Sequence, residues 1–391
     1  MKVIMLSLLG LKRFHKLISM STTLLPQQRR KFDRSLPPAM SNRMNLSKTN
    51  ASIKDVAKSA DVSVGTVSRY FNEPDRVKDE TRLRIQAAIE ALGYLPNNLA
   101  RNFRLGKTGT ILVLVWTIGD PFYGDVLAGI SRVAVEKGYR ISIQEFAPGS
   151  LSNTDLNDIV SSRQADGIVV LGGAAPFRRS DDQPAEAHPA IVVCGETADS
   201  ELLPYPRVQV DGHQACHEIT QYLIGLGHER IAFMRGEQGS AMIQDRETGY
   251  RAAMAQASLP VEDGWMASGN LTAEGARRAT RQLFNAQNRP TAIVCANDEM
   301  AFGAMAELRM LGLSVPEDIS IVGFDNTRYA ALMNPPLTTI AQPTADIGER
   351  SMYRLLRAMK NRVLESGVEY VAHQLILRES ARSPAKEMFP L

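Results

Sequence analysis

The chain has 391 residues, of which 44% are hydrophobic and 22% are charged, a composition typical of folded globular proteins. This length is enough for two or three domains, each with a full core. The cysteines, Cys194, Cys216 and Cys295, lie far apart, which argues against a disulfide framework or zinc site and favours a reducing compartment such as the cytoplasm. No stretch approaches the roughly 18 apolar residues of a membrane span, so we expect no membrane partner.

Positive charge is concentrated at the start of the chain. Residues 1–50 contain ten Lys or Arg and one acidic residue, and residues 51–107 contain ten basic and seven acidic residues. The rest of the chain is acidic overall. A basic front on an acidic body indicates a polyanionic partner, although residues 1–50 taken alone also fit a solvated tail.

Residues 1–50 are expected to be a disordered extension, because residues 21–50 are polar and basic without helical or strand periodicity. Residues 1–17 resemble a weak secretory signal, with a short apolar run and no clean cleavage site. An alternative is that translation starts at Met40 or Met44, since the folded pattern begins only at Ser52.

Three helices are predicted in residues 51–94. Ser52 and Asp55 have the spacing of a capping box at the first helix, and Ser63 is placed to cap the second. Gly93 follows the third helix as its C-cap. Two helices joined by a tight turn and braced by a third are typical of a helix-turn-helix DNA-binding head.

The same region resembles a known family. IKDVAKSADVSVGTVSRYFNEPDRV and GYLPNNLARNFR resemble the LacI/GalR family of bacterial transcription regulators, with the family pattern matched at residues 55–57, 62–63, 66–69, 72, 93–94, 96 and 100–101. The resemblance covers residues 51–385 and implies a DNA-binding regulator controlled by a small effector. NPPLTTIAQPTADIG and LGGAAPF look most similar to the cytidine-responsive branch.

The second helix is expected to lie in the major groove, with its first turn nearest the base edges. Arg69 has the fork to bind guanine, and the hydroxyls of Ser63 and Thr66 can bind phosphate. Val64 and Gly65 offer no hydrogen-bonding side chain, so direct base readout by this helix is expected to be thin. The predicted DNA-contacting residues are Lys54, Ser63, Val64, Gly65, Thr66, Ser68, Arg69, Asn72, Ala100, Arg101 and Phe103. For the lysine, a solvated surface charge is an equal alternative.

Residues 95–108 are predicted to be a hinge. The resemblance implies that this segment forms a short helix on operator DNA, where the paired hinge helices of a dimer kink the duplex with an apolar wedge in the minor groove. The register places Phe103 at the wedge position, where relatives usually have leucine. The alternative for Phe103 is packing against its dimer mate.

Residues 109–391 alternate between apolar strand-like runs and helical stretches, the pattern of α/β doubly wound parallel sheets. The strand candidates are ILVLVW, RISIQEF, GIVVLGG, AIVVCGE, RIAFMRG, TAIVCAND and ISIVGFD. The resemblance implies that this part is a two-lobed periplasmic-binding-protein core, with a chain that crosses between the lobes three times. The expected fold is therefore an all-α helix-turn-helix head followed by an α/β core. We predict lobe one at about 109–211 and 315–343, and lobe two at about 212–314 and 345–391.

Effectors of such sheets bind at the carboxyl ends of strands. The resemblance implies that Arg246 and Asp298 contact the effector, and Phe122 and Tyr123 could supply an aromatic face. Helix N-capping is the alternative for Asp298 and the preferred interpretation of Asp325. The predicted effector-binding residues are Phe122, Tyr123, Ser240, Met242, Arg246, Leu271 and Asp298. Ser240, Met242 and Leu271 replace the side chains that hold purines in relatives, so a purine is disfavoured and we expect a sugar or nucleoside.

These features predict a homodimer, or larger oligomer, that represses transcription by binding near-palindromic double-stranded operator DNA. No cofactor, metal or catalytic role is expected, because the chain has no GxGxxG after its first strand, Walker loop, HExxH or GxSxG. The alternative is a periplasmic sugar-binding protein of an uptake system, with residues 1–20 as its signal. Such proteins lack a segment like 52–105, so that segment discriminates between the two.

Overall fold

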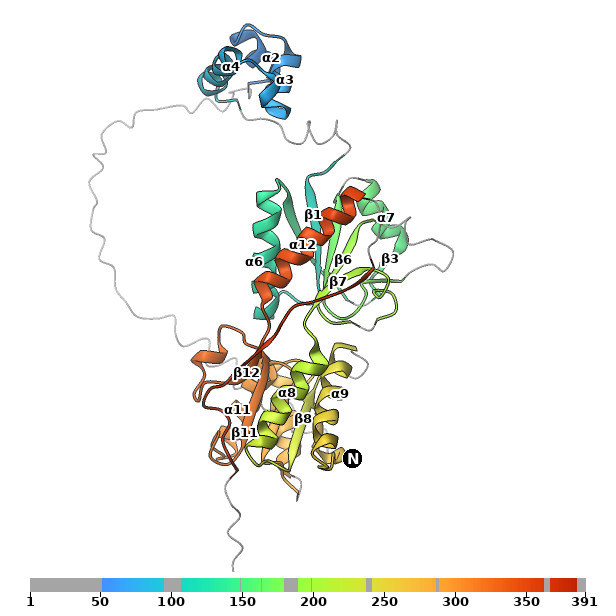
Figure 1. Ribbon diagram of the computed structural model, residues 1–391, viewed down its shortest axis with the longest axis vertical. Helices are drawn as coiled ribbons and strands as arrows, with labels where there is room; N and C mark the ends of the chain where they lie inside the picture. The colour runs from blue at the N-terminus through green and yellow to red at the C-terminus, as the bar shows by residue number, and fades with distance from the viewer. Residues whose placement is uncertain are drawn as a thin grey trace, which may run out of the picture. The chain divides into compact units, whose positions relative to one another are not determined.

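The structure is a computed structural model that describes residues 51–94, 107–147, 149–162, 164–178, 189–197, 199–236, 241–285, 288–361 and 366–384 (Figure 1). The chain divides into two compact units, Met1–Pro96 and Asn97–Leu391. The predictions for residues 1–50 and for hinge residues 95–106 fall outside the described residues.

The first unit contains the predicted helices, α2 (Ile53–Ser59), α3 (Val64–Asn72) and α4 (Asp79–Leu92), with the 3-10 turn η1 (Pro74–Arg76) before α4. The Ser52 backbone N–H donates to Asp55 at 2.8 Å, which confirms the capping box, and Gly93 ends α4 with a φ of 58°. Val56, Val67 and Ile85 have no exposed surface and form the centre of a small core. This core fixes α3 against α2 and α4.

Lobe one of the second unit is built on a parallel sheet in the order β13-β7-β6-β4-β1-β2. Its strands are β1 (Thr110–Val115), β2 (Arg140–Glu145), β4 (Gly167–Leu171), β6 (Ile191–Cys194), β7 (Pro206–Gln209) and β13 (Gly367–Tyr370). The central strands β1, β4 and β6 are buried on both faces, which explains their uninterrupted apolar sequences.

Helices cover both faces of this sheet. Helices α6 (Pro121–Glu136) and α12 (Thr344–Asn361) lie side by side on one face, and α7 (Asn153–Ser161) covers the other beside the short strands β3 (Leu151–Ser152) and β5 (Phe177–Arg178) (Figure 1). The alternation of side chains along the strands therefore supplies two separate cores.

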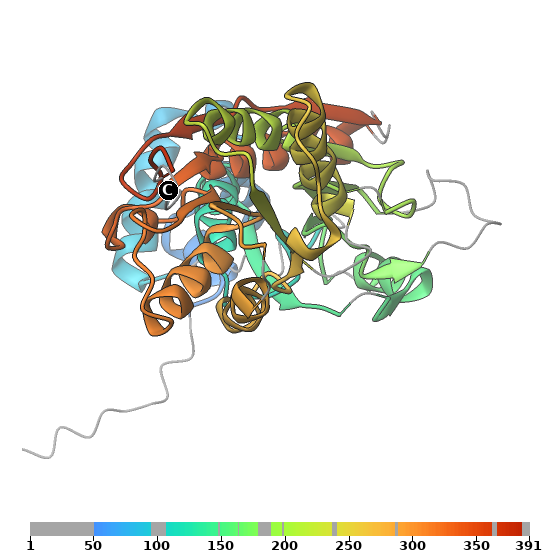
Figure 2. The same ribbon diagram turned by 90° about the horizontal axis from the view of Figure 1, so that it is seen from below.

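Lobe two repeats this plan with the order β14-β12-β11-β10-β8-β9, in which only the β12–β14 pair is antiparallel among the described strands. The strands are β8 (Ile231–Arg235), β9 (Met266–Ser268), β10 (Ala292–Cys295), β11 (Ser320–Asp325), β12 (Thr338–Ala341) and β14 (Gln374–Ile376). The pair α8 (Gly212–Gly225) and α9 (Ala241–Gln256) covers one face, and α10 (Ala273–Asn285) and α11 (Asp298–Met310) cover the other (Figure 2). Short turns η3 (Asp263–Trp265) and η4 (Ala330–Leu332) join these elements.

The predicted two-lobed, doubly wound fold is confirmed, but the sequence-based lobe boundaries are wrong. Strands β11 and β12 belong to the sheet of lobe two, so most of residues 315–343 lies there, whereas α12 and β13 return to lobe one. The chain does cross three times, after β7, after β12 and after β13. A buried parallel strand has the same apolar sequence in either sheet, and only its long-range pairing decides its lobe.

Two glycines bring α6 and α12 together backbone to backbone. A Cβ at Gly129 would lie 2.1 Å from the Ala345 carbonyl oxygen, and one at Gly348 would lie 2.3 Å from the Val126 carbonyl oxygen. Neither position accepts a side chain unless a helix moves. Helix α12 begins directly after the chain crosses from β12 of lobe two back to lobe one. The contact between α6 and α12 therefore positions lobe one relative to the segments that connect the two lobes.

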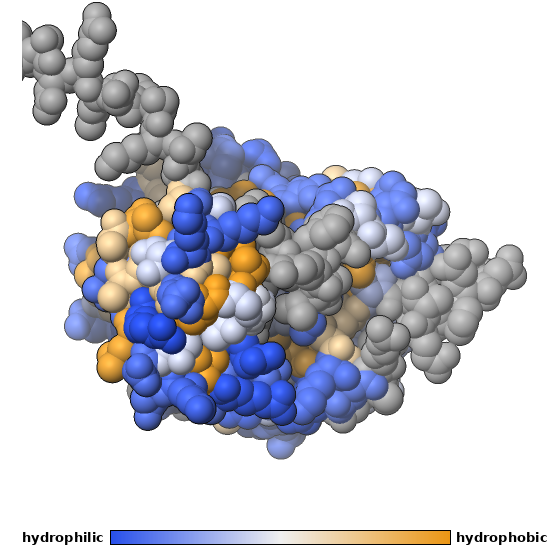
Figure 3. Space-filling view, turned by 90° about the horizontal axis from the view of Figure 1, so that it is seen from above, coloured by the Kyte–Doolittle hydropathy of each residue, from blue (hydrophilic) through white to orange (hydrophobic). Residues whose placement is uncertain are grey.

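Polar residues dominate the surface seen in Figure 3, where hydrophobic residues form small patches. Lobe two contributes exposed apolar side chains at Met310, Tyr329 and Leu332, with exposed fractions of 75%, 44% and 77%. Within the described residues, no helix has the length and apolar character needed to cross a membrane.

Candidate DNA-binding and effector-binding sites

The first turn of α3 is held by a local hydrogen-bonded cap. The Thr66 backbone N–H donates to Ser63 Oγ at 3.1 Å, and the two hydroxyls share a hydrogen bond of 2.9 Å. One hydroxyl proton is used inside the cap, and the other is available to an external acceptor. A helix N-terminus with such a hydroxyl is suited to a phosphate. Ser68, further along the helix, is half-buried.

The first turn of α3 is exposed and apolar, and exposed cations lie on the same helix and on α2. Arg69 on α3 and Lys54 on α2 are exposed. Val64 is 40% exposed, and a Cβ at Gly65 would meet only the cap hydroxyl, 3.6 Å away. The predicted DNA contacts outside the described part of the chain are the Asn72 side chain, Ala100, Arg101 and Phe103.

Arg246 joins the two lobes of the second unit. Its Nε and Nη2 donate to Glu196 Oε2 at 3.0 and 2.7 Å, and Glu196 follows β6 of lobe one whereas Arg246 lies on α9 of lobe two. Nη1 donates to the Ala296 carbonyl at 2.5 Å and lies 3.8 Å from Asp325 Oδ1. The guanidinium stacks 3.7 Å from the centre of the Phe324 ring. With Arg246 only 2% exposed and Glu196 only 3%, water is excluded from this pair.

One arginine faces several carboxyls here. Burial raises the pKa of Asp120, of Glu196 and of Asp325, while the charge of Arg246 lowers the pKa of each. Burial also raises the pKa of the Tyr123 phenol, and the charges of Asp120 and Asp325 act in the same direction. These groups of both lobes therefore share one electrostatic environment.

Asp298 is a structural carboxyl in this conformation. It has no exposed surface, and its Oδ2 accepts from the Thr327 backbone N–H at 2.7 Å and from the Thr327 hydroxyl at 3.2 Å. Its Oδ1 accepts from the Thr339 hydroxyl at 2.6 Å. The side chain of Asn297, not Asp298, caps α11. Asp298 thus ties α11 to the segments that follow β11 and form β12, and its predicted contact with effector stays a prediction that this geometry does not favour.

Asp325 ends β11 with a φ of 118°, a conformation that residues with a side chain rarely adopt. Its Oδ1 accepts from Gln342 Nε2 at 2.7 Å and approaches Arg246. The next helical turn, η4, has Tyr329 as its N-cap, so the interpretation of Asp325 as a helix cap is wrong. Of Asp298 and Asp325, it is Asp325 that lies beside Arg246, where Glu196 is the nearer carboxylate.

The other predicted effector residues that the structure describes follow the carboxyl ends of strands, as expected. Phe122 and Tyr123 begin α6 with their rings edge to face and 5.4 Å apart. Met242 and Leu271 are half-buried, and Leu271 has a φ of 57°, which is unusual for a large side chain. Ser240 lies outside the described residues.

Comparison with known proteins identifies the family. Residues 52–97 match the model described as bacterial regulatory proteins, lacI family, and residues 220–381 match the periplasmic binding protein-like domain. The chain is 36% identical to the HTH-type transcriptional repressor CytR of Escherichia coli strain K12 over 335 residues, which are 86% of this chain and 97% of that protein. The chain belongs to the LacI family of bacterial transcriptional regulators.

Two solved structures extend the LacI-family match. The lac repressor dimer bound to operator and the anti-inducer ONPF is 25% identical, with a TM-score of 0.73 over 85% of this chain and 99% of that chain. The transcriptional regulator CelR–cellobiose complex is 28% identical, with a TM-score of 0.63 over 85% of this chain and 100% of that chain. These relatives share both the DNA-binding head and the two-lobed core with this chain. The LacI-family chain is therefore a DNA-binding transcriptional repressor and not an enzyme. The alternative of a periplasmic sugar-binding protein is not favoured.

Replacing Arg69 with alanine is expected to weaken sequence preference in this LacI-family head. The loss of one bidentate guanine contact corresponds to about 1–3 kcal/mol of discrimination. A selection of binding sites from random DNA measures it. Arg84→Ala removes the same charge from the exposed face of α4 and should lower affinity without changing base preference. An Arg69→Ala selection that returns the wild-type site would contradict the assigned contact.

Asp298 predicts a pH dependence of stability. Burial raises its pKa to about 7, so the native state keeps a proton that the unfolded chain releases above pH ~4. This group therefore makes the free energy of unfolding fall as pH rises from ~4 to ~7. Asp298→Asn should remove that fall, so the variant gains stability relative to wild type across this window. Urea unfolding at several pH values measures the difference in free energy of unfolding between the variant and wild type. Asp125→Asn, at an exposed carboxyl, is the control. If the difference between Asp298→Asn and wild type does not change with pH, the pKa of Asp298 is not raised.

Two carboxyls of the interlobe region, Glu196 and Asp120, are missing from the sequence-based effector set. Glu196 lies two residues after the apolar run of β6, and Asp120 follows β1 and caps α6. The rule that ligand-binding residues follow the carboxyl ends of strands points to both positions. What the sequence does not show is that a residue after β6 meets Arg246 of the other lobe.

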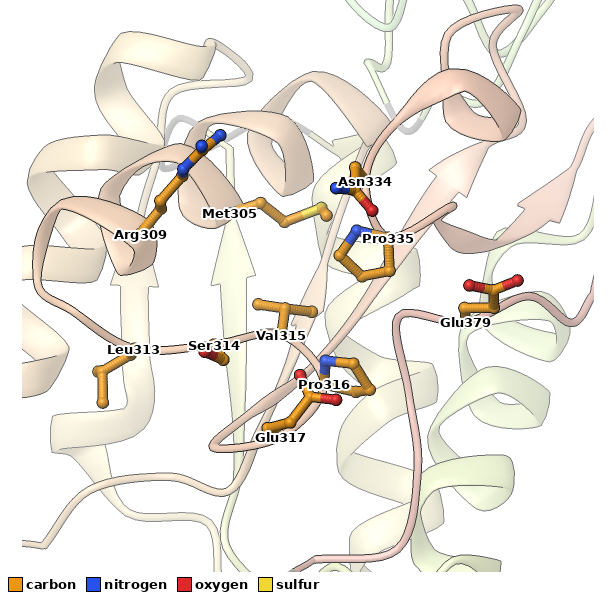
Figure 4. Close-up of a pocket in the computed structure, with 10 residues that line it drawn as sticks. All are labelled: Met305, Arg309, Leu313, Ser314, Val315, Pro316, Glu317, Asn334, Pro335 and Glu379. Carbon is orange, nitrogen blue, oxygen red and sulfur yellow. The ribbon is translucent and has the colours of Figure 1, made fainter.

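Lobe two also contains a cavity of about 610 Å³, separate from these groups. Met305 and Arg309 of α11 line one side, and Val315, Pro316 and Pro335 line the other (Figure 4). None of the predicted effector residues lines it.

Proposed function

We propose that this LacI-family repressor is a homodimer whose affinity for near-palindromic operator DNA is controlled by a sugar or nucleoside bound between its lobes. The observation that carries the proposal is Arg246, a buried cation of lobe two whose main partner, Glu196, belongs to lobe one. A ligand that engages this arginine necessarily changes the contact between the lobes. The effector would lie against Arg246 and Asp325, with Phe122 and Tyr123 as its aromatic wall.

Control of DNA binding follows from linkage. A ligand that prefers one interlobe angle shifts the population toward that angle, and it changes operator affinity by the same coupling free energy. In a two-fold dimer, the angle sets the separation of the two hinge segments and hence of the DNA-binding heads. Since the partner is chromosomal DNA, we place this activity in the cytoplasm.

The relatives support the dimer and the ligand class. The lac repressor structure is a dimer on its operator, and the CelR structure is a complex with cellobiose. Exposed apolar side chains of lobe two, such as Met310 and Leu332, are available for self-association. Two heads related by a two-fold axis require half-sites with the same symmetry.

A thermal-shift screen tests the proposed effector class. Cellobiose, ribose, cytidine and uridine are added separately to the full chain, and a ligand at 100 times its Kd adds about 2.7 kcal/mol of stability, a rise of a few degrees in Tm. Each compound that raises Tm is then titrated into a complex of the protein with an operator obtained by selection. The proposal fails if no sugar or nucleoside raises Tm, or if those that do leave operator affinity unchanged.

A further inference from the structure

We propose that Glu196 determines the charge class of the effector: by holding Arg246 with a carboxylate of the chain's own, it makes the site accept uncharged or cationic ligands rich in hydrogen-bond donors and refuse anionic ones. This inference rests on the proposed function, because it concerns the ligand of the same interlobe site. It assigns a role in ligand specificity to Glu196, which lies in lobe one and faces Arg246 of lobe two.

Three of the five N–H donors of Arg246, including both of those on its Nε–Nη2 edge, are already engaged by the chain itself. Its Nε and Nη2 are both bonded to Glu196 Oε2, and its Nη1 is bonded to the Ala296 carbonyl. The Phe324 ring covers one face of the guanidinium. A phosphate or carboxylate could bind the Nε–Nη2 edge of this arginine in bidentate fashion only by displacing Glu196, and Glu196 would then be buried without its cation.

More carboxyl groups than cations lie around the Arg246 guanidinium. Glu196 and Asp325 are both within 4 Å of the Arg246 guanidinium, at 2.7 and 3.8 Å, and Asp120 is close enough for the charge of Arg246 to lower its pKa. Glu196 and Asp325 are only 3% and 8% exposed, so water screens them little. An anionic ligand would add another negative charge to this set, whereas hydroxyl or amino groups would donate to it.

Glu196 Oε1 is a buried acceptor that has no hydrogen-bond donor among the described residues. This atom lies against the backbone at the start of α8, where a Cβ at Gly212 would come within 1.9 Å of it. An unpaired carboxylate oxygen in a dry site is costly, and its cost is lowered by donors and raised by further negative charge.

Matched pairs of probes that differ only by a phosphate test the inference. Cytidine and cytidine 5′-monophosphate, ribose and ribose 5-phosphate, and inorganic phosphate alone are titrated by calorimetry and thermal shift into the full chain. The variant Glu196→Gln keeps the shape of the side chain and removes its charge, and Glu196→Ser serves as a second variant should the first fold poorly. Glu145→Gln, an exposed carboxyl of the same lobe, is the control.

The wild type and Glu145→Gln should show no Tm rise with inorganic phosphate or either phosphorylated probe. Glu196→Gln, with Arg246 released, should bind inorganic phosphate at least about tenfold more tightly than wild type. The inference is overturned if wild type binds a phosphorylated probe as well as its unphosphorylated partner, or if Glu196→Gln and Glu196→Ser keep the wild-type response to phosphate. A failure of the neutral probes alone would count against the proposed effector class, while the inorganic phosphate titration still decides the role of Glu196.

Discussion

Replacing Arg246 with methionine is expected to lower the free energy of unfolding by about 3–5 kcal/mol and to abolish the response to effector. Methionine fills a similar volume against Phe324 but leaves Glu196 and Asp325 buried without their cation, and removal of one member of a buried ion pair has a cost of this size. Urea unfolding measures the stability, and operator titration with and without a ligand found in the screen measures the response.

A double variant separates the two causes of this loss. In Arg246→Met with Glu196→Leu, most of the uncompensated charge is gone, so much of the lost stability should return while the effector response stays absent. Arg278→Met, which breaks only an exposed pair with Glu274, should change stability by no more than ~0.5 kcal/mol. Equal losses in the single and double variants would show that the ion pair is not the source of the effect.

Substitution of Gly129 by alanine is expected to destabilise lobe one by about 3 kcal/mol. The added methyl would lie 2.1 Å from the Ala345 carbonyl oxygen, which belongs to the backbone of α12 and cannot turn aside as a side chain would. The two helices must separate, and the contact that seats α12 after the second crossing is then lost. Urea unfolding of the full chain measures the change.

Gly124, five residues earlier on the same helix, is the matched control. A Cβ there meets nothing within 4 Å, so alanine should stabilise α6 by about 0.5 kcal/mol through its higher helix propensity. If Gly129→Ala and Gly124→Ala behave alike, the close approach of α6 and α12 does not contribute as the geometry requires.

Local sequence signals predicted the elements of this fold well. The capping box at Ser52, the N-cap at Ser63 and the C-cap at Gly93 are read from neighbouring residues, and all are present. Buried parallel strands such as β1 and β11 are also recognisable, because they are short apolar runs bounded by turns. These features depend on interactions within a few residues, which one sequence displays directly.

The parts that the sequence does not predict depend on contacts between distant segments. The lobe to which β11 and α12 belong is decided by pairing across the sheet and by packing on α6, neither of which leaves a local pattern. Likewise, Asp298 and Asp325 both lie where an apolar strand ends. Only the fold shows that Thr327 and Thr339 donate to Asp298 while Asp325 reaches Arg246. A pair of carboxyls with equal local signals therefore has different roles.

The open first turn of α3 bears on how a regulator of this kind acquires new target genes. Gly65 is exposed and does not need the left-handed conformation, and a Cβ added there would have an ordinary contact of 3.6 Å with Ser63 Oγ, so a glutamine or arginine there would leave the fold of the head intact. Such a residue would put a hydrogen-bonding side chain on the turn that we predict to face the base edges, at a position that now has no side chain, and it would also favour the helix. After gene duplication, a single substitution at Gly65 could therefore change which operator the protein prefers without a loss of stability. This position is thus one at which related regulators can diverge to control different genes.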